Sequence, residues 1–339
     1  MAEKNVHIVY LRVIATVFVV LIHASTGYLY RIDTNAFDWN YANWINAATR
    51  CSVPIFVIIS GVLLIPKEET TWEFYKKRIP KLIYPFIFWT IIYLVYYFYR
   101  YTNFKLLSID KILSISQDKI LHGANAHLWY LYMIIGLYLA IPFIRKILIQ
   151  SSKREIELFL LFWLISMCIT SKSLYSVMPK FDLVFFSGYV GYLVLGYYIR
   201  ISTFSFKKNK IIFALGYILM VVIAAVGTNL LNQNATKLNT FFYNYVFITT
   251  AFAAGFLYLW VKEACKRSES IPKWVLSIDK YSFGIYLIHI LPLNYFHPLI
   301  SKYLTTVWVI PLATICTIIA SIVITFLLRK LPYGKYISG

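Results

Sequence analysis

The chain is a succession of long apolar runs separated by short polar segments. Runs of about 18 or more apolar residues are long enough to cross the hydrocarbon layer of a membrane as helices. None has the strict alternation of apolar and polar residues that is typical of strands. We therefore predict an all-α, polytopic transmembrane bundle of about ten helices. Their predicted limits are 8–29, 44–65, 82–99, 127–148, 156–171, 181–199, 210–227, 240–261, 282–301 and 304–328.

Composition supports the membrane assignment. Of the 339 residues, 60% are hydrophobic and 14% are charged, whereas a soluble domain carries about 25% charged residues. The net charge of +19 would suggest nucleic acid in a soluble protein. Here the basic residues lie in short segments between apolar runs, and no compact basic domain is left to bind nucleic acid. We expect membrane lipid, and no nucleic acid, as a partner.

The positions of the basic residues predict the orientation of the bundle. If the N-terminus lies in the cytoplasm, the cytoplasmic segments carry most of the 33 Lys and Arg residues, as the positive-inside rule requires. With ten helices, both termini are then cytoplasmic. No shift in composition marks a second domain. We expect residues 1–339 to form one transmembrane domain with no appended soluble domain.

Two ionisable residues interrupt the first apolar run. Such residues are costly in hydrocarbon and are functional candidates for that reason. Arg12 and His23 are eleven positions apart, which at roughly 100° per residue is three turns plus about 20°. Both side chains should therefore leave the same face of the helix, about 16 Å apart along its axis. A packing histidine and a snorkelling arginine are the alternatives, and the pairing gives a polar, functional face equal weight with them.

Further polar residues are predicted in the outer half of the bundle. Asn43, Asn46 and Arg50 form a stripe at i, i+3 and i+7 at the outer end of the second run. Arg50 could hold a carboxylate or a sugar hydroxyl, or could anchor the helix at the interface. His127 opens the fourth run and His289 lies in the ninth. The predicted topology places these residues and His23 at similar depth.

The densest basic cluster lies in the second cytoplasmic segment, within residues 76–81. Lys77, Arg78 and Lys81 belong to it. Such a cluster could bind phosphate groups, although a topology determinant is the alternative that charge alone favours.

The four cysteines do not have the spacing of a metal site. Cys51, Cys168, Cys265 and Cys316 fall in different predicted helices and form no CxxC pair. We interpret them as small packing residues, and we expect no metal.

Several motifs together resemble the membrane-bound acyltransferase-3 family. They are the Arg12-to-His23 spacing, SVPIFVIISG at 52–61, HLWYL at 127–131 and GIYLIH at 284–289. Their order and placement cover the chain from about residue 5 to about residue 325. The stretch NAATRCSVP at 46–54 is similar to the branch that O-acetylates bacterial surface polysaccharides.

The resemblance implies a substrate pair and a location. The donor would be acetyl-CoA or another acyl-CoA, used as a substrate, with no permanently bound cofactor. The acceptor would be a hydroxyl of a surface glycan or lipid-linked sugar, in the bacterial plasma membrane. Donor phosphates would meet the family's Arg-x-x-Arg element. Arg78 and Lys81 stand at its two positions here, and the lysine keeps the charge but not the bidentate geometry. Lys77 would assist them.

The resemblance also implies roles for the polar residues. His23 would act either as a general base on the acceptor hydroxyl or as a covalent acyl carrier. Arg12 would position His23 or the pantetheine arm. The acceptor would be bound by residues of the outer half, some of which would also stabilise a developing oxyanion. These are Asn46, Arg50, His127, Trp129 and His289.

Two other functions fit a ten-helix bundle with a polar seam. One is a transporter or exporter of a surface-glycan component. The other is a non-catalytic membrane module that binds a small molecule. His23 discriminates between these possibilities, because an enzyme requires it to react and a carrier requires only a polar lining.

Overall fold

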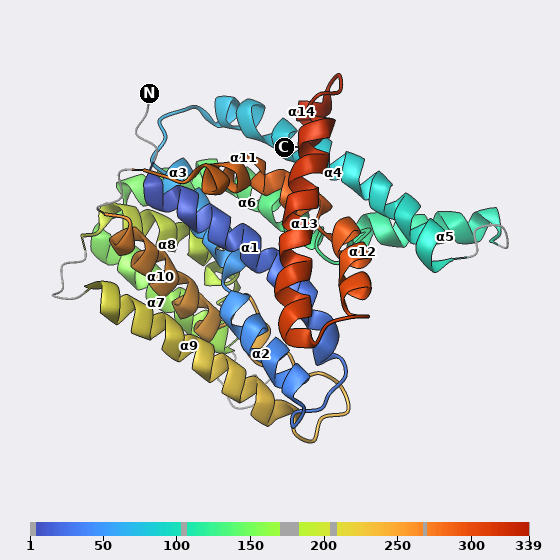
Figure 1. Cartoon of the computed structure of the whole chain (residues 1–339). Helices are drawn as coiled ribbons and strands as arrows, with labels where there is room; N and C mark the ends of the chain where they lie inside the picture. Colours follow the sequence, from blue (N-terminus) through green and yellow to red (C-terminus); the bar gives the residue numbers. More distant parts are fainter. Residues whose placement is uncertain (1–4, 103–106, 170–182, 204–208, 267–269, 339) are drawn as a thin grey trace. The chain divides into compact units, whose positions relative to one another are not determined.

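The computed structural model describes residues 5–102, 107–169, 183–203, 209–266 and 270–338. Within these ranges the regular structure is helical and no strand occurs. Seven helical segments are long and apolar enough to cross a membrane, and a bent pair of helices provides an eighth. The protein is therefore an all-α, polytopic membrane bundle, as the pattern of apolar runs predicts (Figure 1).

Eight of the ten predicted spans coincide with these segments. They are α1 (Val6–Leu29), α2 (Phe37–Thr49) with α3 (Ser52–Leu64), α4 (Thr71–Tyr101), α6 (Trp129–Gln150), α9 (Asn209–Asn232), α10 (Ile248–Ala264) preceded by η3 (Phe241–Tyr243), the bent pair α11 (Lys273–Ile288) and α12 (Ile290–Ile300), and α13 (Thr306–Leu328). The fifth and sixth predicted spans correspond to shorter helices, α7 (Lys153–Ile169) and α8 (Val190–Ile201). Parts of both spans fall in residues 170–182, outside the described residues.

The chain forms two compact units. Unit 1 comprises Met1–Lys67 and Arg145–Val323, and unit 2 comprises Glu68–Ile144 and Ile324–Gly339. In unit 1, α1 packs against α2, α3 and α11 (Figure 1), while α9 packs on α10 and α3 on α8. The first helix, which carries Arg12 and His23, is thus enclosed by helices that come from both ends of the sequence.

Two prolines create helix breaks at polar residues in unit 1. A proline within a helix has no N–H for the carbonyl four residues before it, and its ring clashes with that carbonyl. Pro54 stands four residues after Arg50, where α2 ends before α3 begins. Pro292 stands four residues after Ile288, the last residue of α11, and the helix pair α11 and α12 is bent by 83° at this point. The breaks therefore place Arg50 and His289 at helix ends.

Glycines allow α3 and α8 to pack backbone against backbone. A β-carbon on Gly61 would lie 2.1 Å from the carbonyl oxygen of Leu193, and one on Gly196 would lie 2.2 Å from that of Ile58. Small residues at such crossings let membrane helices approach closely. The close contact fixes α3, and with it the break at Arg50, against the rest of unit 1.

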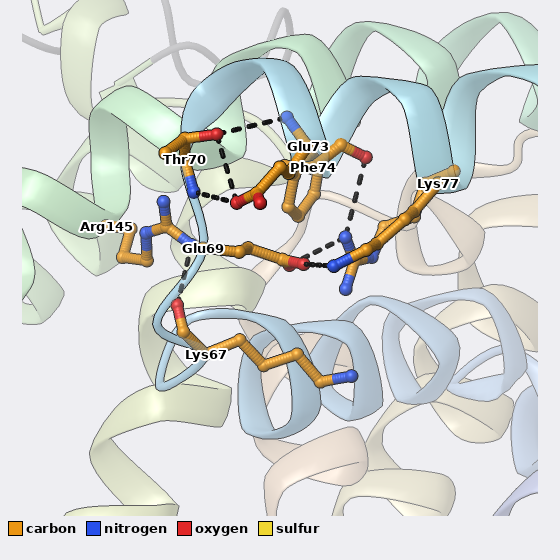
Figure 2. Close-up of polar contacts among 8 residues, drawn as sticks. Lys67, Glu69, Thr70, Glu73, Phe74, Lys77 and Arg145 are labelled. Carbon is orange, nitrogen blue, oxygen red and sulfur yellow. Dashed lines mark hydrogen bonds and ion pairs between the residues drawn. The ribbon is translucent and has the colours of Figure 1, made fainter.

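In unit 2 the long helix α4 starts earlier than predicted. Thr70 and Glu73 form a capping box, in which the Thr70 hydroxyl accepts from the Glu73 N–H and the Glu73 carboxylate accepts from the Thr70 N–H (Figure 2). This cap begins the helix at Thr71. The basic cluster at residues 76–81, expected in a connecting segment, therefore lies on helical turns.

Two further helices belong to unit 2. The amphipathic α5 (Ile109–His122) follows α4, and α14 (Gly334–Ser338) packs along α4 near the end of the chain. The indole N–H of Trp89 donates to the Ile337 carbonyl at 2.9 Å and fixes this contact.

Candidate functional site

Arg12 forms an ion pair with a carboxylate of α11. Its Nη1 lies 2.5 Å from Oδ1 of Asp279. The Arg12 side chain is 30% exposed and that of Asp279 is 10% exposed, so the pair is only partly desolvated. The ion pair satisfies an arginine within an apolar helix and joins the N-terminal parts of α1 and α11.

His23 contacts the same helix pair at the break between α11 and α12. Its ring centroid lies 5.0 Å from that of His289. His289 is fully buried, and its Nδ1 lies 2.7 Å from the Tyr286 carbonyl oxygen. Because a carbonyl oxygen only accepts, Nδ1 carries the hydrogen of a neutral His289 ring and Nε2 carries the lone pair. Arg12 and His23 therefore both contact α11 or its end, as a shared helical face predicts.

A hydrogen-bonded chain runs from α1 to the break after α2. Asn46 is fully buried and donates from Nδ2 to the hydroxyl of Ser25 at 2.6 Å. Arg50 in turn donates from Nη2 to Oδ1 of Asn46 at 2.7 Å. Ser25 lies two residues after His23 on α1. The chain thus links Asn46 and Arg50 to the segment of α1 that carries His23.

Two tyrosines flank the Arg50 guanidinium. Its central carbon lies 4.6 Å from the ring centroid of Tyr243 and 5.7 Å from that of Tyr245. The Tyr243 hydroxyl donates to the buried side chain of Asn43, which itself donates to the Ala225 carbonyl at 2.9 Å. Among the residues that the structure describes, no carboxylate pairs with Arg50 and nothing accepts from its buried Nε–H. This cation is held by rings and amides rather than by a counter-charge.

Unit 2 contains a second buried histidine. His127 is 2% exposed, and its Nδ1 lies 3.1 Å from Oδ1 of Asn125. The ring of Tyr93 meets the imidazole edge-on, with centroids 4.9 Å apart. Trp129 follows at the first position of α6 and packs edge-on against Tyr130. His127 and Trp129 are thus neighbours at the start of one helix.

The basic cluster of unit 2 is organised around a carboxylate. Glu69, whose side chain is 7% exposed, lies 2.6 Å from Arg78 and 3.3 Å from Lys77 (Figure 2). The Arg78 guanidinium also packs over the ring of Phe74 at 4.3 Å. Lys81 is exposed, one helical turn beyond Lys77. Arg78 is therefore held in place with its side chain 13% exposed, whereas the side chain of Lys77, which also pairs with Glu69, is 61% exposed.

The predicted site residues fall into two groups, one in each unit. Unit 1 holds Arg12, His23, Asn46, Arg50 and His289; unit 2 holds Lys77, Arg78, Lys81, His127 and Trp129. Within unit 1, the Arg12–Asp279 ion pair links α1 to α11, and the His23–His289 ring contact links α1 to the end of α11. The hydrogen bonds of Asn46 link α1 to α2. Within unit 2, Lys77 and Arg78 share Glu69, while His127 and Trp129 lie at the start of α6.

Two carboxylates were missing from the predicted site. Asp279 lies before residue 282, the predicted start of the ninth span, yet α11 begins at Lys273. Glu69 lies between the second and third predicted spans, which end at 65 and begin at 82. The sequence held a signal for each. Asp279 is an acidic residue beside an apolar run, and Glu69 is an acidic residue shortly before the basic residues 76–81. Their partners, however, depend on tertiary contacts.

The fold defines a multi-pass membrane protein whose first helix carries an arginine and a histidine that contact partners on a neighbouring helix. A family model described as an acyltransferase domain, acyltransferase-3, matches residues 5–326. The chain therefore belongs to the acyltransferase-3 family and is a membrane acyltransferase. No curated protein and no solved structure matches the chain.

Proposed function

We propose that the protein moves an acyl group, specifically acetyl, from cytoplasmic acyl-CoA to a hydroxyl of an extracytoplasmic or lipid-linked glycan. The observation that carries this proposal is the polar face of α1. In a chain of the acyltransferase-3 family, that face holds the His23 imidazole beside His289 and an arginine paired with Asp279. A carrier would need polar lining, but not an imidazole placed next to a second imidazole.

His23 is the proposed reacting residue. As a general base, it takes the proton of the acceptor hydroxyl while the oxygen attacks the thioester carbonyl. The carbon–sulfur bond breaks, and CoA leaves as the thiolate. As a covalent carrier, its ring nitrogen attacks the thioester first, and CoA leaves as the thiolate. The acceptor oxygen then attacks the acyl-imidazole, the carbon–nitrogen bond breaks, and the released imidazole takes the proton of the hydroxyl. His289, whose Nδ1 is committed to the Tyr286 carbonyl, packs against His23 and restricts its orientation in either route.

The remaining residues of unit 1 have supporting roles in the proposal. Arg12, oriented by Asp279, positions His23 or the pantetheine arm. Arg50, held over Tyr243 and hydrogen-bonded to Asn46, offers an unused Nε–H for an acceptor oxygen. Donors that are already oriented before the reaction are the ones that stabilise developing negative charge most effectively.

In unit 2, the basic residues of α4 are proposed to bind the phosphates of the donor. Lys77 and Lys81 lie one turn apart and are exposed. In the proposal, the Lys77 ammonium, which pairs with Glu69 in this structure, turns to the same phosphate cluster as Lys81. Arg78 adds a guanidinium fixed by Glu69 and Phe74. His127 and Trp129, at the start of α6, are proposed to contact the acceptor. The proposed location is a bacterial plasma membrane, in keeping with the likeness of residues 46–54 to the polysaccharide O-acetylating branch.

The proposal is tested by reconstitution. The full chain is purified into lipid vesicles and incubated with acetyl-CoA labelled in the acetyl group and with lipid-linked or free oligosaccharides. We expect label to enter the glycan in an alkali-labile ester, with release of one CoA thiol for each ester formed. Glycan transport without label transfer, or the absence of measurable acyl-CoA binding, contradicts the proposal.

A further inference from the structure

The helix α5 carries an apolar stripe that the described part of the chain leaves largely exposed. Ile109, Ile112, Leu113 and Ile120 fall within an arc of roughly 100° at 100° per residue. Ile109 is 76% exposed, Leu113 62% and Ile120 50%. Within the described chain, α5 has no buried residue at all. The other side of α5 carries Asp110, Lys111 and Asp118, with Leu121 as its one exposed apolar residue. An amphipathic helix of this kind is typical of a segment that lies in a membrane interface.

The contacts of α5 place it beside the ends of two membrane-spanning helices of the same unit. The hydroxyl of Tyr132, three residues into α6, donates to the carbonyl of Ile120. The ammonium of Lys119 lies 4.5 Å from the ring centroid of Tyr97, four residues before the end of α4. At 1.5 Å per residue, both contacts lie about 5 Å from the ends of these helices. The ends of membrane-spanning helices are where tyrosine and tryptophan rings are enriched, at the headgroup level.

Both ends of α5 have capping residues, so α5 is a distinct helix rather than a helical stretch of a loop. Ser108 caps its N-terminus by accepting a hydrogen bond from the Lys111 N–H at 3.4 Å. Gly123, with a φ of 103°, ends it, because a positive φ suits glycine. The chain therefore leaves α4, runs along α5 as a separate helix and then enters α6.

The charges of α5 indicate what holds it. Asp110 and Asp118 balance Lys111 and Lys119, so the charges of these four side chains cancel. Binding to anionic headgroups requires an excess of positive charge, which α5 does not have. We propose that α5 is an interfacial helix whose apolar stripe inserts about 5–10 Å into the headgroup and acyl boundary of the bilayer, on the side where α4 ends, and that burial of apolar surface holds it there. The predicted topology makes this the extracytoplasmic side.

Site-specific photo-crosslinking tests the proposal on the full chain. A photo-reactive phenylalanine derivative is introduced at Leu113 in the apolar stripe or, as the matched control, at Ser114 on the polar face. Both positions are exposed, so neither change disturbs a core. The protein is reconstituted into phosphatidylcholine vesicles, illuminated and examined by mass spectrometry. We expect a phospholipid adduct at position 113 that is severalfold more abundant than at position 114.

Three results would overturn the proposal. They are equal lipid adducts at the two positions, no lipid adduct at position 113, and an adduct to another polypeptide at position 113 in cell membranes. A second arm adds phosphatidylglycerol to the vesicles. Because the charges of α5 cancel, adduct yield should not change, and a strong rise would show that electrostatic attraction holds the helix instead. None of these outcomes depends on acyl transfer, so the proposed function is tested separately.

Discussion

The Arg12–Asp279 ion pair gives a quantitative prediction. Replacing Asp279 by Asn removes the carboxylate that lies 2.5 Å from the guanidinium and leaves a partly buried cation without its partner. Exposed ion pairs contribute about 0.2–1 kcal/mol, and breaking a buried pair costs about 3–5 kcal/mol. Since the two side chains are 30% and 10% exposed, we expect a coupling free energy between these limits, about 1–3 kcal/mol.

A double-mutant cycle measures this coupling. The wild type, Arg12→Gln, Asp279→Asn and the double variant are unfolded by denaturant in mixed micelles, and the interaction term is taken from the four unfolding free energies. The control cycle uses Lys153 and Glu157, whose charged atoms lie 3.9 Å apart with side chains 53% and 46% exposed. Its coupling should be at most about 0.5 kcal/mol. If the Arg12–Asp279 coupling is no larger than the control value, the ion pair does not orient Arg12 and the reasoning fails.

Three further predictions follow from contacts in the two units. Glu69→Gln should lower stability by about 1–3 kcal/mol, between the exposed and buried limits, because the nearly buried carboxylate pairs with two cations that are partly exposed. Glu73→Gln should change stability little, since Gln also serves in a capping box, and equal melting curves for the two variants would contradict this. Gly196→Val should reduce the folded yield in detergent, because a β-carbon at this position meets a backbone carbonyl. Gly136→Val should not reduce it, because open space surrounds that position, and comparable yields of the two variants would refute the close crossing of α3 and α8. In the label-transfer assay, Arg50→Lys should lose nearly as much acyl transfer as Arg50→Gln. The reason is that lysine cannot stack flat on a ring while donating to Asn46. Full activity of the lysine variant would show that charge alone suffices.

Much of the fold could be predicted because membrane-spanning helices are recognisable in the sequence as long apolar runs. The apolar runs are continuous, and the hydrocarbon layer imposes a minimum length on each. Element boundaries were less accurate, since α11 starts nine residues before the predicted 282 and α4 eleven before the predicted 82. The reason is that helices continue through polar caps into water, where hydropathy gives no signal. The capping box at Thr70 and Glu73 was the missing clue for α4.

The site was predictable in its parts but not in its pairings. Helical periodicity alone put Arg12 and His23 on one face, and both contact α11 or its end. Their partners, Asp279 and His289, are more than 250 residues away in the chain, and no local pattern carries that information. The breaks that place Arg50 and His289 at helix ends could have been inferred from Pro54 and Pro292, because a proline disturbs the carbonyl four residues before it.

The central claim is that acyl transfer takes place at His23. The most direct measurement is the rate of label transfer from acetyl-CoA to glycan by three reconstituted proteins: the wild type, His23→Ala and His297→Ala. His297 is the control because it is a half-buried histidine of α12 with no proposed role. Its ring centroid lies 5.6 Å from that of Tyr28, on the helix that carries His23. We expect the His23 variant to lose about 100-fold or more of the rate, as for removal of a general base, and the His297 variant to stay near the wild type. Transfer by His23→Ala at the wild-type rate, with the protein folded, would contradict the claim.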